Sequence, residues 1–235
     1  MKRFLVMSIV AAIVFVLTAC SGAAPASKDT PAAGNKVLLV GRDGGGDAIT
    51  TKRLREVHGF DVKIVSDKEV TSEHANGCVL VFVSESVNSG KIRDKFSKLP
   101  VPVIYTEGQS TSDTGMSVTD GYGSLTGGNS AKTIQIKDSK HPLAAGLQNN
   151  VDVYKDNGKM GYATPGPEAI VVATVPNEDQ KATIFAYEKG VKNAKGDVVT
   201  ARELFFYMFE GEEINQTEDG WKLFDAAVRW VTSKK

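Results

Sequence analysis

The chain has 235 residues, of which 41% are hydrophobic, 24% charged and 8% aromatic, and this composition is typical of a single globular domain. Lysine plus arginine and aspartate plus glutamate each number 28, so the chain lacks the basic excess of a general nucleic-acid-binding protein. Two cysteines and three histidines are too few for a disulfide framework or a histidine-rich metal site. We therefore expect no nucleic-acid partner, no metal and no cofactor.

Residues 1–19 have the pattern of an export signal. Lys2 and Arg3 precede an apolar stretch from Phe4 to Leu17 that is interrupted only by Ser8. This stretch is shorter than the roughly 20 residues of a transmembrane helix and fits the core of a signal peptide. The sequence Leu-Thr-Ala-Cys that ends at Cys20 resembles the bacterial lipobox. The resemblance implies that the Cys20 thiol is acylated and that the chain is cut before it.

An acylated Cys20 would make membrane lipid a partner and would place the protein outside the cytoplasm, on the cell membrane or the outer membrane. Residues 20–35 are rich in Ala, Gly, Ser and Pro and are predicted to be a flexible tether. The folded domain is expected at 36–235. With Cys20 modified, Cys78 has no intrachain disulfide partner.

The first half of this domain alternates apolar runs with segments of helical spacing. The run that begins at Lys36 is continuously apolar, as in a strand buried on both faces. Ile49, Leu54 and Val57 then lie on one helical face, and Gly59 ends that segment. Such alternation predicts right-handed crossovers and a parallel sheet. The predicted strands are 36–41, 60–65, 78–83 and 100–105, and the predicted helices are 47–58, 67–75 (weak) and 87–99.

The second half has a looser pattern. Gly, Ser and Thr are dense over 107–130, which predicts functional loops or a small excursion. A terminal helix is predicted from Thr217, its N-cap, with Trp221 and Trp230 serving packing rather than ligand binding. The run 204–209 is either a last strand or helical. Antiparallel strands added to the parallel core are predicted at 133–136, 151–154, 169–175 and 182–187.

Five short segments, taken in order, resemble the class I glutamine-amidotransferase-like fold, particularly secreted bacterial domains related to trehalose-utilisation-type proteins. The resemblance covers about residues 36–232 and implies an α/β three-layer sandwich with a mainly parallel, flavodoxin-like sheet plus the added antiparallel strands. The segments are 79–86, 101–107, 113–116, 138–146 and 217–230.

Enzymes of this family use a cysteine nucleophile on a tight strand-to-helix turn, assisted by a histidine and an acidic residue. Cys78 instead opens the third predicted strand, and the sequence contains no Gly-x-Cys-x-Gly segment. A Gly-x-Ser-x-Gly elbow is also absent from the sequence. We therefore predict no catalytic residue inherited from the family.

Ligands of open α/β sheets collect beyond the carboxyl ends of the strands. Those ends supply Arg42, Asp43, Ser84, Glu85 and Glu107 as candidate ligand-binding residues. In one interpretation they form a cleft in which Arg42 pairs with an anion or with Glu107, while Ser84 and Glu85 offer hydrogen bonds. In the other, Ser84 and Glu85 cap the following helix and Glu107 satisfies backbone amides. The sequence leaves both interpretations open.

Two further features are interpreted structurally. The glycine-rich segment 41–47 matches no phosphate-binding motif, and Asp43 and Asp47 would repel phosphate, so we predict a tight turn with Asp47 as N-cap. His141, a sixth candidate ligand-binding residue, is interpreted mainly as orienting the turn before Pro142.

The sequence as a whole favours a lipid-anchored extracytoplasmic protein, not catalytic, with a binding, assembly or envelope-organising role. A carbohydrate or an envelope protein is the expected partner. The alternative is a hydrolase or carbohydrate-related enzyme that uses Glu107, Glu85 or His141. A third class, a structural component of a surface assembly, would self-associate through an exposed apolar patch.

Overall fold

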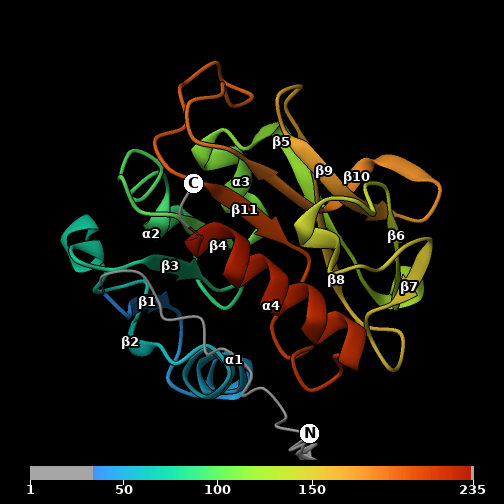
Figure 1. Cartoon of the computed structure of the whole chain (residues 1–235), viewed down its shortest axis with the longest axis horizontal. Coiled ribbons are helices and arrows are strands. Elements are labelled where there is room, and N and C mark those ends of the chain that lie inside the picture. Colours follow the sequence, from blue (N-terminus) through green and yellow to red (C-terminus); the bar gives the residue numbers. More distant parts are fainter. Residues whose placement is uncertain (1–33, 234–235) are drawn as a thin grey trace, which may run out of the picture. The chain divides into compact units, whose positions relative to one another are not determined.

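A mixed sheet forms the centre of the part of the chain that the structure describes, residues 34–233 of a computed structural model (Figure 1). The strand order is β2-β1-β3-β4-β11-β10-β9-β6-β7, and β8 joins the sheet through β10 and carries β5. The predicted signal segment, the acylation of Cys20 and almost all of the tether lie outside the described residues.

The parallel half of the sheet consists of β2, β1, β3, β4 and β11. The alternating pattern predicted the first four of these strands, and β11 settles the run 204–209 as a strand. Its central strands are apolar over most of their length and are buried on both faces, which explains why they lack the in–out alternation of a half-exposed strand. The strands are β1 (Lys36–Val40), β2 (Asp61–Val65), β3 (Leu80–Val83), β4 (Val103–Tyr105) and β11 (Glu203–Phe206).

The other half is antiparallel, which confirms the expectation of added strands. β10 pairs with β9 on one side and with β11 and then β8 on the other, so it connects the two halves. The strands are β5 (Ser117–Leu125), β6 (Thr133–Ile136), β7 (Asn150–Asp152), β8 (Met160–Pro165), β9 (Ile170–Val175) and β10 (Glu178–Tyr187).

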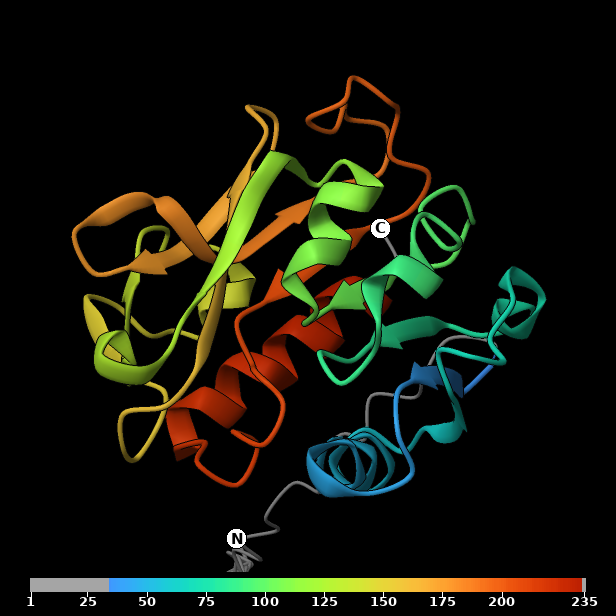
Figure 2. The ribbon, with the colours of Figure 1, turned by 180° about the vertical axis from the view of Figure 1, so that it is seen from behind.

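Helices cover both faces of the parallel half and complete a flavodoxin-like α/β sandwich. α1 (Gly45–Glu56) and α4 (Glu218–Thr232) lie on one face (Figure 1), and α2 (Ser89–Ile92) and α3 (Gly108–Thr114) lie on the other (Figure 2). No helix within residues 34–233 has the length and apolar character needed to cross a bilayer. Short 3-10 turns are η1 (Ser72–Ala75), η2 (Gly127–Asn129) and η3 (Pro142–Ala144).

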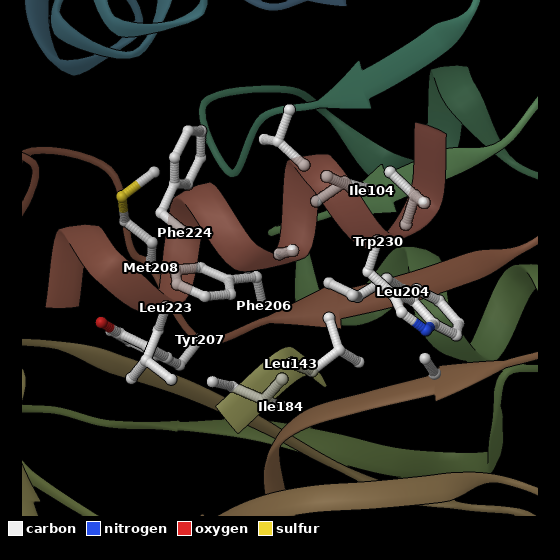
Figure 3. Close-up of a cluster of buried hydrophobic side chains, with 14 of the residues drawn as sticks. Ile104, Leu143, Ile184, Leu204, Phe206, Tyr207, Met208, Leu223, Phe224 and Trp230 are labelled. Carbon is white, nitrogen blue, oxygen red and sulfur yellow. The ribbon is translucent and has the colours of Figure 1, made fainter. Parts of the chain in front are cut away.

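The core on the α4 face is built from aromatic and aliphatic side chains of the helix and the sheet (Figure 3). Phe224 of α4 meets Phe206 of β11 edge-on, with 5.8 Å between ring centroids. Burying each such side chain contributes about 1.5–3 kcal/mol. The Thr217 hydroxyl accepts a hydrogen bond from Gly220 N at 3.0 Å, so the predicted N-cap is confirmed. Trp230 is buried in this core, as expected of a packing residue.

The sequence predictions were least accurate where polar residues dominate. The helix predicted over 87–99 shortens to α2, because Arg93 at its end has a φ of 50° and the chain continues as turns. Segment 107–130, expected to be loops, contains α3 and β5, and β8 was not predicted. α3 has no apolar stripe: its buried side chains include Ser110, Thr111 and Thr114. The weak helix predicted over 67–75 reduces to η1.

Candidate functional site

Polar side chains gather where the parallel strands end. We call the turns after β1, β3, β4 and β11 the carboxyl edge, and they are neighbours because these four strands are adjacent and parallel. The turn after β1 carries Arg42 and Asp43, the turn after β3 carries Ser84 and Glu85, and the turn after β4 carries Glu107. Five of the six predicted ligand-binding residues therefore lie at this edge.

A buried carboxylate ties two of these turns together. Asp47 is 2% exposed and accepts hydrogen bonds from Ser84 Oγ (2.5 Å), Ser86 Oγ (2.6 Å) and the backbone N of Arg42 (2.7 Å). Three donors satisfy a carboxylate that would otherwise be costly to bury. A Cβ at Gly41 would lie 2.4 Å from Asp47 Oδ2. A side chain at this position would therefore displace the Asp47 carboxylate, and glycine lets the backbone lie against it.

The prediction that Asp47 is the N-cap of α1 is wrong. The helix begins two residues earlier, at Gly45, and Gly44 occupies the N-cap position with a φ of 152° that favours glycine. Asp47 lies inside the first turn and directs its carboxylate across to the β3 turn. A tight glycine turn is present, as predicted.

Arg42 pairs with a residue that the sequence did not single out. Its Nη1 lies 2.5 Å from Glu210 Oε1, so the predicted pairing with Glu107 is not formed. Glu107 is instead the N-cap of α3, and its Oε1 accepts a hydrogen bond from Gln109 N at 2.9 Å. This confirms the expectation that Glu107 satisfies a backbone amide. Burial raises the pKa of Glu107, and the charge of Asp113 raises it further.

Glu85 connects the β3 turn to the loop between β11 and α4. Its Oε2 accepts a hydrogen bond from Glu210 N at 3.1 Å. Burial raises its pKa to about 7, and the charges of Glu107 and Glu210 add to that increase, while the Glu210 amide and Lys159 oppose it. Neither Ser84 nor Glu85 caps α2, because that helix begins only at Ser89.

The loop between β11 and α4, residues 207–217, supplies a second buried acid. Glu213 is 4% exposed, and its Oε2 accepts a hydrogen bond from Gly211 N at 2.9 Å. It packs on α1 so closely that a Cβ at Gly46 would lie 1.9 Å from Oε2. Burial raises its pKa to about 7, and Asp47 and Glu210 add to the shift. A parallel assignment of the strand predicted at 204–209 would have placed Glu210 and Glu213 here.

An open cleft of about 1080 Å³ lies beside this edge. Its lining is polar, carries both signs of charge and includes Arg42, Asp43 and Ser86, whereas Ser84, Glu85 and Glu107 are not part of it. No aromatic side chain is among the lining residues. The remaining polar and charged lining residues are Arg55, Ser66, Asp67, Lys68, Glu69 and Asn88.

His141 does not join the carboxyl edge. It is the N-cap of η3, where its Nδ1 accepts a hydrogen bond from Leu143 N at 3.3 Å, and its ring lies 5.6 Å from that of Trp230 near the end of α4. Trp230 O is bonded to Arg202, which directly precedes β11, so this is the amino end of the sheet. The interpretation that His141 orients the turn before Pro142 is confirmed, and the residue lies apart from the other five candidates.

A thiol–histidine pair is absent from the carboxyl edge over residues 34–233. Cys78 precedes β3, so it lies at the opposite edge, where its Sγ contacts His74 O at 3.5 Å. Burial raises the pKa of this thiol, which keeps it protonated. His58 contacts Asp225, and His74 contacts Thr71. In the same range, no three His, Cys, Asp or Glu side chains are grouped so as to hold a metal ion.

Comparison with known proteins gives a likeness of fold. No protein-family model and no curated protein sequence matches the chain. A solved protein from Thermoplasma acidophilum, assigned as part of a GMP synthase, is 15% identical, with 81% of this chain and 90% of that chain covered and a TM-score of 0.56. A glutamine amidotransferase from Thermotoga maritima is 12% identical, with 83% and 82% covered and a TM-score of 0.47. The first likeness shows a class I glutamine-amidotransferase-like fold, as the sequence predicted.

Proposed function

We propose that this protein is a lipid-anchored extracytoplasmic binding protein that performs no amidotransferase-type catalysis. One observation carries the second part of this proposal: within residues 34–233 the carboxyl edge has neither a thiol nor a histidine. The hydroxyls of Ser84 and Ser86 both donate to Asp47, and no histidine is placed to accept a proton from them. Attack by a serine or cysteine needs such a base.

The polar cleft supports a binding role. Arg42, Arg55 and Lys68 offer donors, and Asp43 and Glu69 offer acceptors, so a ligand that bears hydroxyl, amide or charged groups matches its lining. The absence of aromatic lining residues favours recognition by hydrogen bonds over stacking on a sugar face. A charged glycan fragment or a polar segment of an envelope protein is therefore the proposed ligand class.

Membrane anchoring is tested on the full chain expressed in a bacterial host. We expect palmitate to label the protein, the mature chain to begin at Cys20, and the label to remain with the membrane fraction. Cys20→Ala should abolish labelling, whereas Cys78→Ala, a matched control, should leave it intact. An intact mass with the first 19 residues still attached and no acyl group would overturn the assigned location.

Ligand binding is tested by thermal stabilisation of the full-length protein in detergent, because a ligand of the native state raises the melting temperature with its concentration. Charged glycan fragments and envelope peptides serve as probes, with a parallel measurement of product. Arg42→Gln should remove the stabilisation, and Arg229→Gln, on an exposed position of α4, should retain it. Equal loss in both variants would contradict a site in the cleft.

The alternative, a hydrolase, is favoured by one observation. Glu85 and Glu107 lie close enough for their charges to interact, and the pKa of Glu85 is raised to about 7, as suits a general acid beside a second carboxylate. If the protein turned over a glycan, Glu85→Gln should lower kcat by about 100-fold or more. Turnover that depends on Glu85 would replace the binding proposal.

A further inference from the structure

Two carboxyl groups fasten the loop of residues 207–217 to the rest of the carboxyl edge. Glu85, in the β3 turn, accepts the backbone N–H of Glu210 at 3.1 Å. Glu213, in the loop itself, accepts the N–H of Gly211 at 2.9 Å and fills the space that the missing side chain of Gly46 leaves on α1. The loop therefore contacts the turn after β3 and the start of α1 through carboxylate oxygens.

The same loop holds a side chain of the cleft. Glu210 offers its backbone N–H to Glu85 and its carboxylate to Arg42, at 2.5 Å from Nη1. Arg42 lines the cleft, and 64% of its side chain is exposed. A displacement of Glu210 would leave the guanidinium of Arg42 without this partner. The position of the loop is thus linked to the charge that the cleft presents.

The charges around the two carboxyl groups are mostly of the same sign. Glu85 faces Glu107 from the β4 turn, Glu210 from the loop and Lys159 from the segment before β8. Glu213 faces Asp47 from α1 and Glu210 from its own loop. Arg42, which carries a positive charge at this edge, is paired with Glu210. Ionisation of both groups would therefore put two further negative charges into a partly buried, already acidic cluster.

We propose that Glu85 and Glu213 form a pH-sensitive latch, which holds the loop of residues 207–217 closed when the two groups carry protons and releases it when they ionise. Release removes Glu210 from Arg42 and frees the guanidinium for an anionic group of a ligand. The role in ligand binding rests on the proposed function, whereas the latch itself does not.

The direction of the pH dependence follows from linkage. Burial raises both pKa values from 4.5 to about 7 in the closed loop, and in an open loop exposed to water they would return towards 4.5. The closed loop then binds protons more tightly than the open loop, so closure is favoured in full below pH 4.5 and weakens as the pH rises from 4.5 to about 7.

Hydrogen exchange of single amides in the full-length protein tests the latch without any ligand. After correction for the intrinsic rate, the protection of the Glu210 and Gly211 amides should fall by about 10-fold or more between pH 5 and pH 8. A variant with both Glu85→Gln and Glu213→Gln keeps the acceptor oxygens but cannot ionise, so its protection should not change over this range. Glu218→Gln, on an exposed residue of α4, should retain the wild-type slope.

Two results would overturn the proposal: equal wild-type protection at both pH values, or a slope that survives in the double variant. If the double variant does not fold, the carboxyl carbons of Glu85 and Glu213 can be titrated by NMR in the wild-type protein. Midpoints near 7 are expected, and midpoints below 5 would exclude the latch. If the wild-type protein bound no ligand but its amide protection still fell with pH, the proposed function would be overturned and the latch would stand.

Discussion

The interface between α1 and α4 and the carboxyl edge both bury carboxyl groups, with opposite consequences. At the interface, the Asp225 carboxylate accepts hydrogen bonds from Nε and Nη2 of Arg53, at 2.8 and 2.7 Å. Its Oδ1 also lies 3.0 Å from Nε2 of His58. Burial alone would raise its pKa, but these hydrogen bonds and charges lower it below 3.8. At the edge, Glu85 and Glu213 lack such partners, and burial raises their pKa values to about 7.

The difference shows that the hydrogen-bonding and charged partners of a carboxyl group, and not burial alone, decide whether its pKa is lowered or raised. A carboxylate held by a bidentate guanidinium fixes two helices in place. A carboxyl group bonded only to backbone amides and surrounded by acids keeps a proton that it can release. We therefore regard the interface as structural and the edge as the part of the fold that responds to its surroundings.

The largest expected effect is at the interface. Asp225→Asn leaves Arg53 and His58 without their carboxylate and should lower the free energy of unfolding by about 3 kcal/mol in urea denaturation at pH 7. Because its native pKa is lowered, the contribution of Asp225 is present above pH 3.8 and disappears as the pH falls through the native value. Asp219→Asn, at an exposed pair with Lys222, is the control and should cost little. Similar losses of unfolding free energy in both variants would show that the Asp225 cluster is no more important than an exposed ion pair.

Glu203 provides a third case for the comparison, a buried carboxyl group with an oxygen that accepts no hydrogen bond from the described residues. Glu203 is 3% exposed, its Oε2 has no hydrogen-bond partner among residues 34–233, and burial raises its pKa to about 8. A raised pKa makes the native state lose stability as the pH rises from 4.5 to about 8. The stability of Glu203→Gln relative to the wild type should thus rise by about 2 kcal/mol between pH 4.5 and about pH 6.5.

The comparison at two pH values matters because a buried amide has its own cost. That cost is the same at each pH and cancels in the slope, whereas the ionisation of Glu203 does not. The buried hydroxyl of Tyr105 also has no hydrogen-bond partner in the described part of the chain, and its pKa is raised by burial and by the nearby Glu203. A constant difference between variant and wild type would show that Glu203 is ionised in the native state.

A smaller effect should appear where the edge contacts α1. Gly46→Ala would force the Glu213 carboxylate from its position, at a cost of about 1–2 kcal/mol in thermal or urea unfolding. Glu213→Ala in the same chain should recover most of that loss, since it removes the clashing atoms. Gly128→Ala, where an added Cβ meets nothing within 4 Å, is the matched control. Failure of the second substitution to rescue the first would show that the strain lies elsewhere.

The smallest effect is expected at the N-cap of α4, and the other losses of stability can be compared with it. Thr217 ends the loop of residues 207–217 and caps α4 with a neutral hydrogen bond. Thr217→Ala should cost about 1 kcal/mol with no dependence on pH, as measured by urea denaturation at pH 5 and pH 8. Thr217→Ser, which keeps the hydroxyl, should be close to the wild type. A pH-dependent loss would mean that the cap is coupled to the acids of the loop.

The sequence was most informative where apolar residues cluster. Strands such as β1 and β3 were predicted because a strand that is buried on both faces forms a continuous apolar run, which is easy to recognise in the sequence. α3 was missed because its buried face consists of Ser and Thr, and the hydroxyls of Thr111 and Thr114 form hydrogen bonds to carbonyls of the same helix. β5 was missed because glycines and exposed residues break its alternation.

The candidate site was predictable in part for the same reason. Residues that directly follow strong strands, such as Arg42 and Glu85, were found from the rule that ligands collect at carboxyl ends. Glu210 and Glu213 were not, because the run at 204–209 did not reveal its direction or its neighbours. His141 was a candidate because it belongs to a segment shared with the family, and no spacing in the sequence reports its distance from β1 or β3.

The strand order has a consequence for the way the protein is made. β11, at residues 203–206, is the last strand to leave the ribosome, yet it lies between β4 and β10 in the middle of the sheet. The two halves therefore stay unjoined until residues 203–206 have been synthesised, and contacts so distant in sequence form slowly.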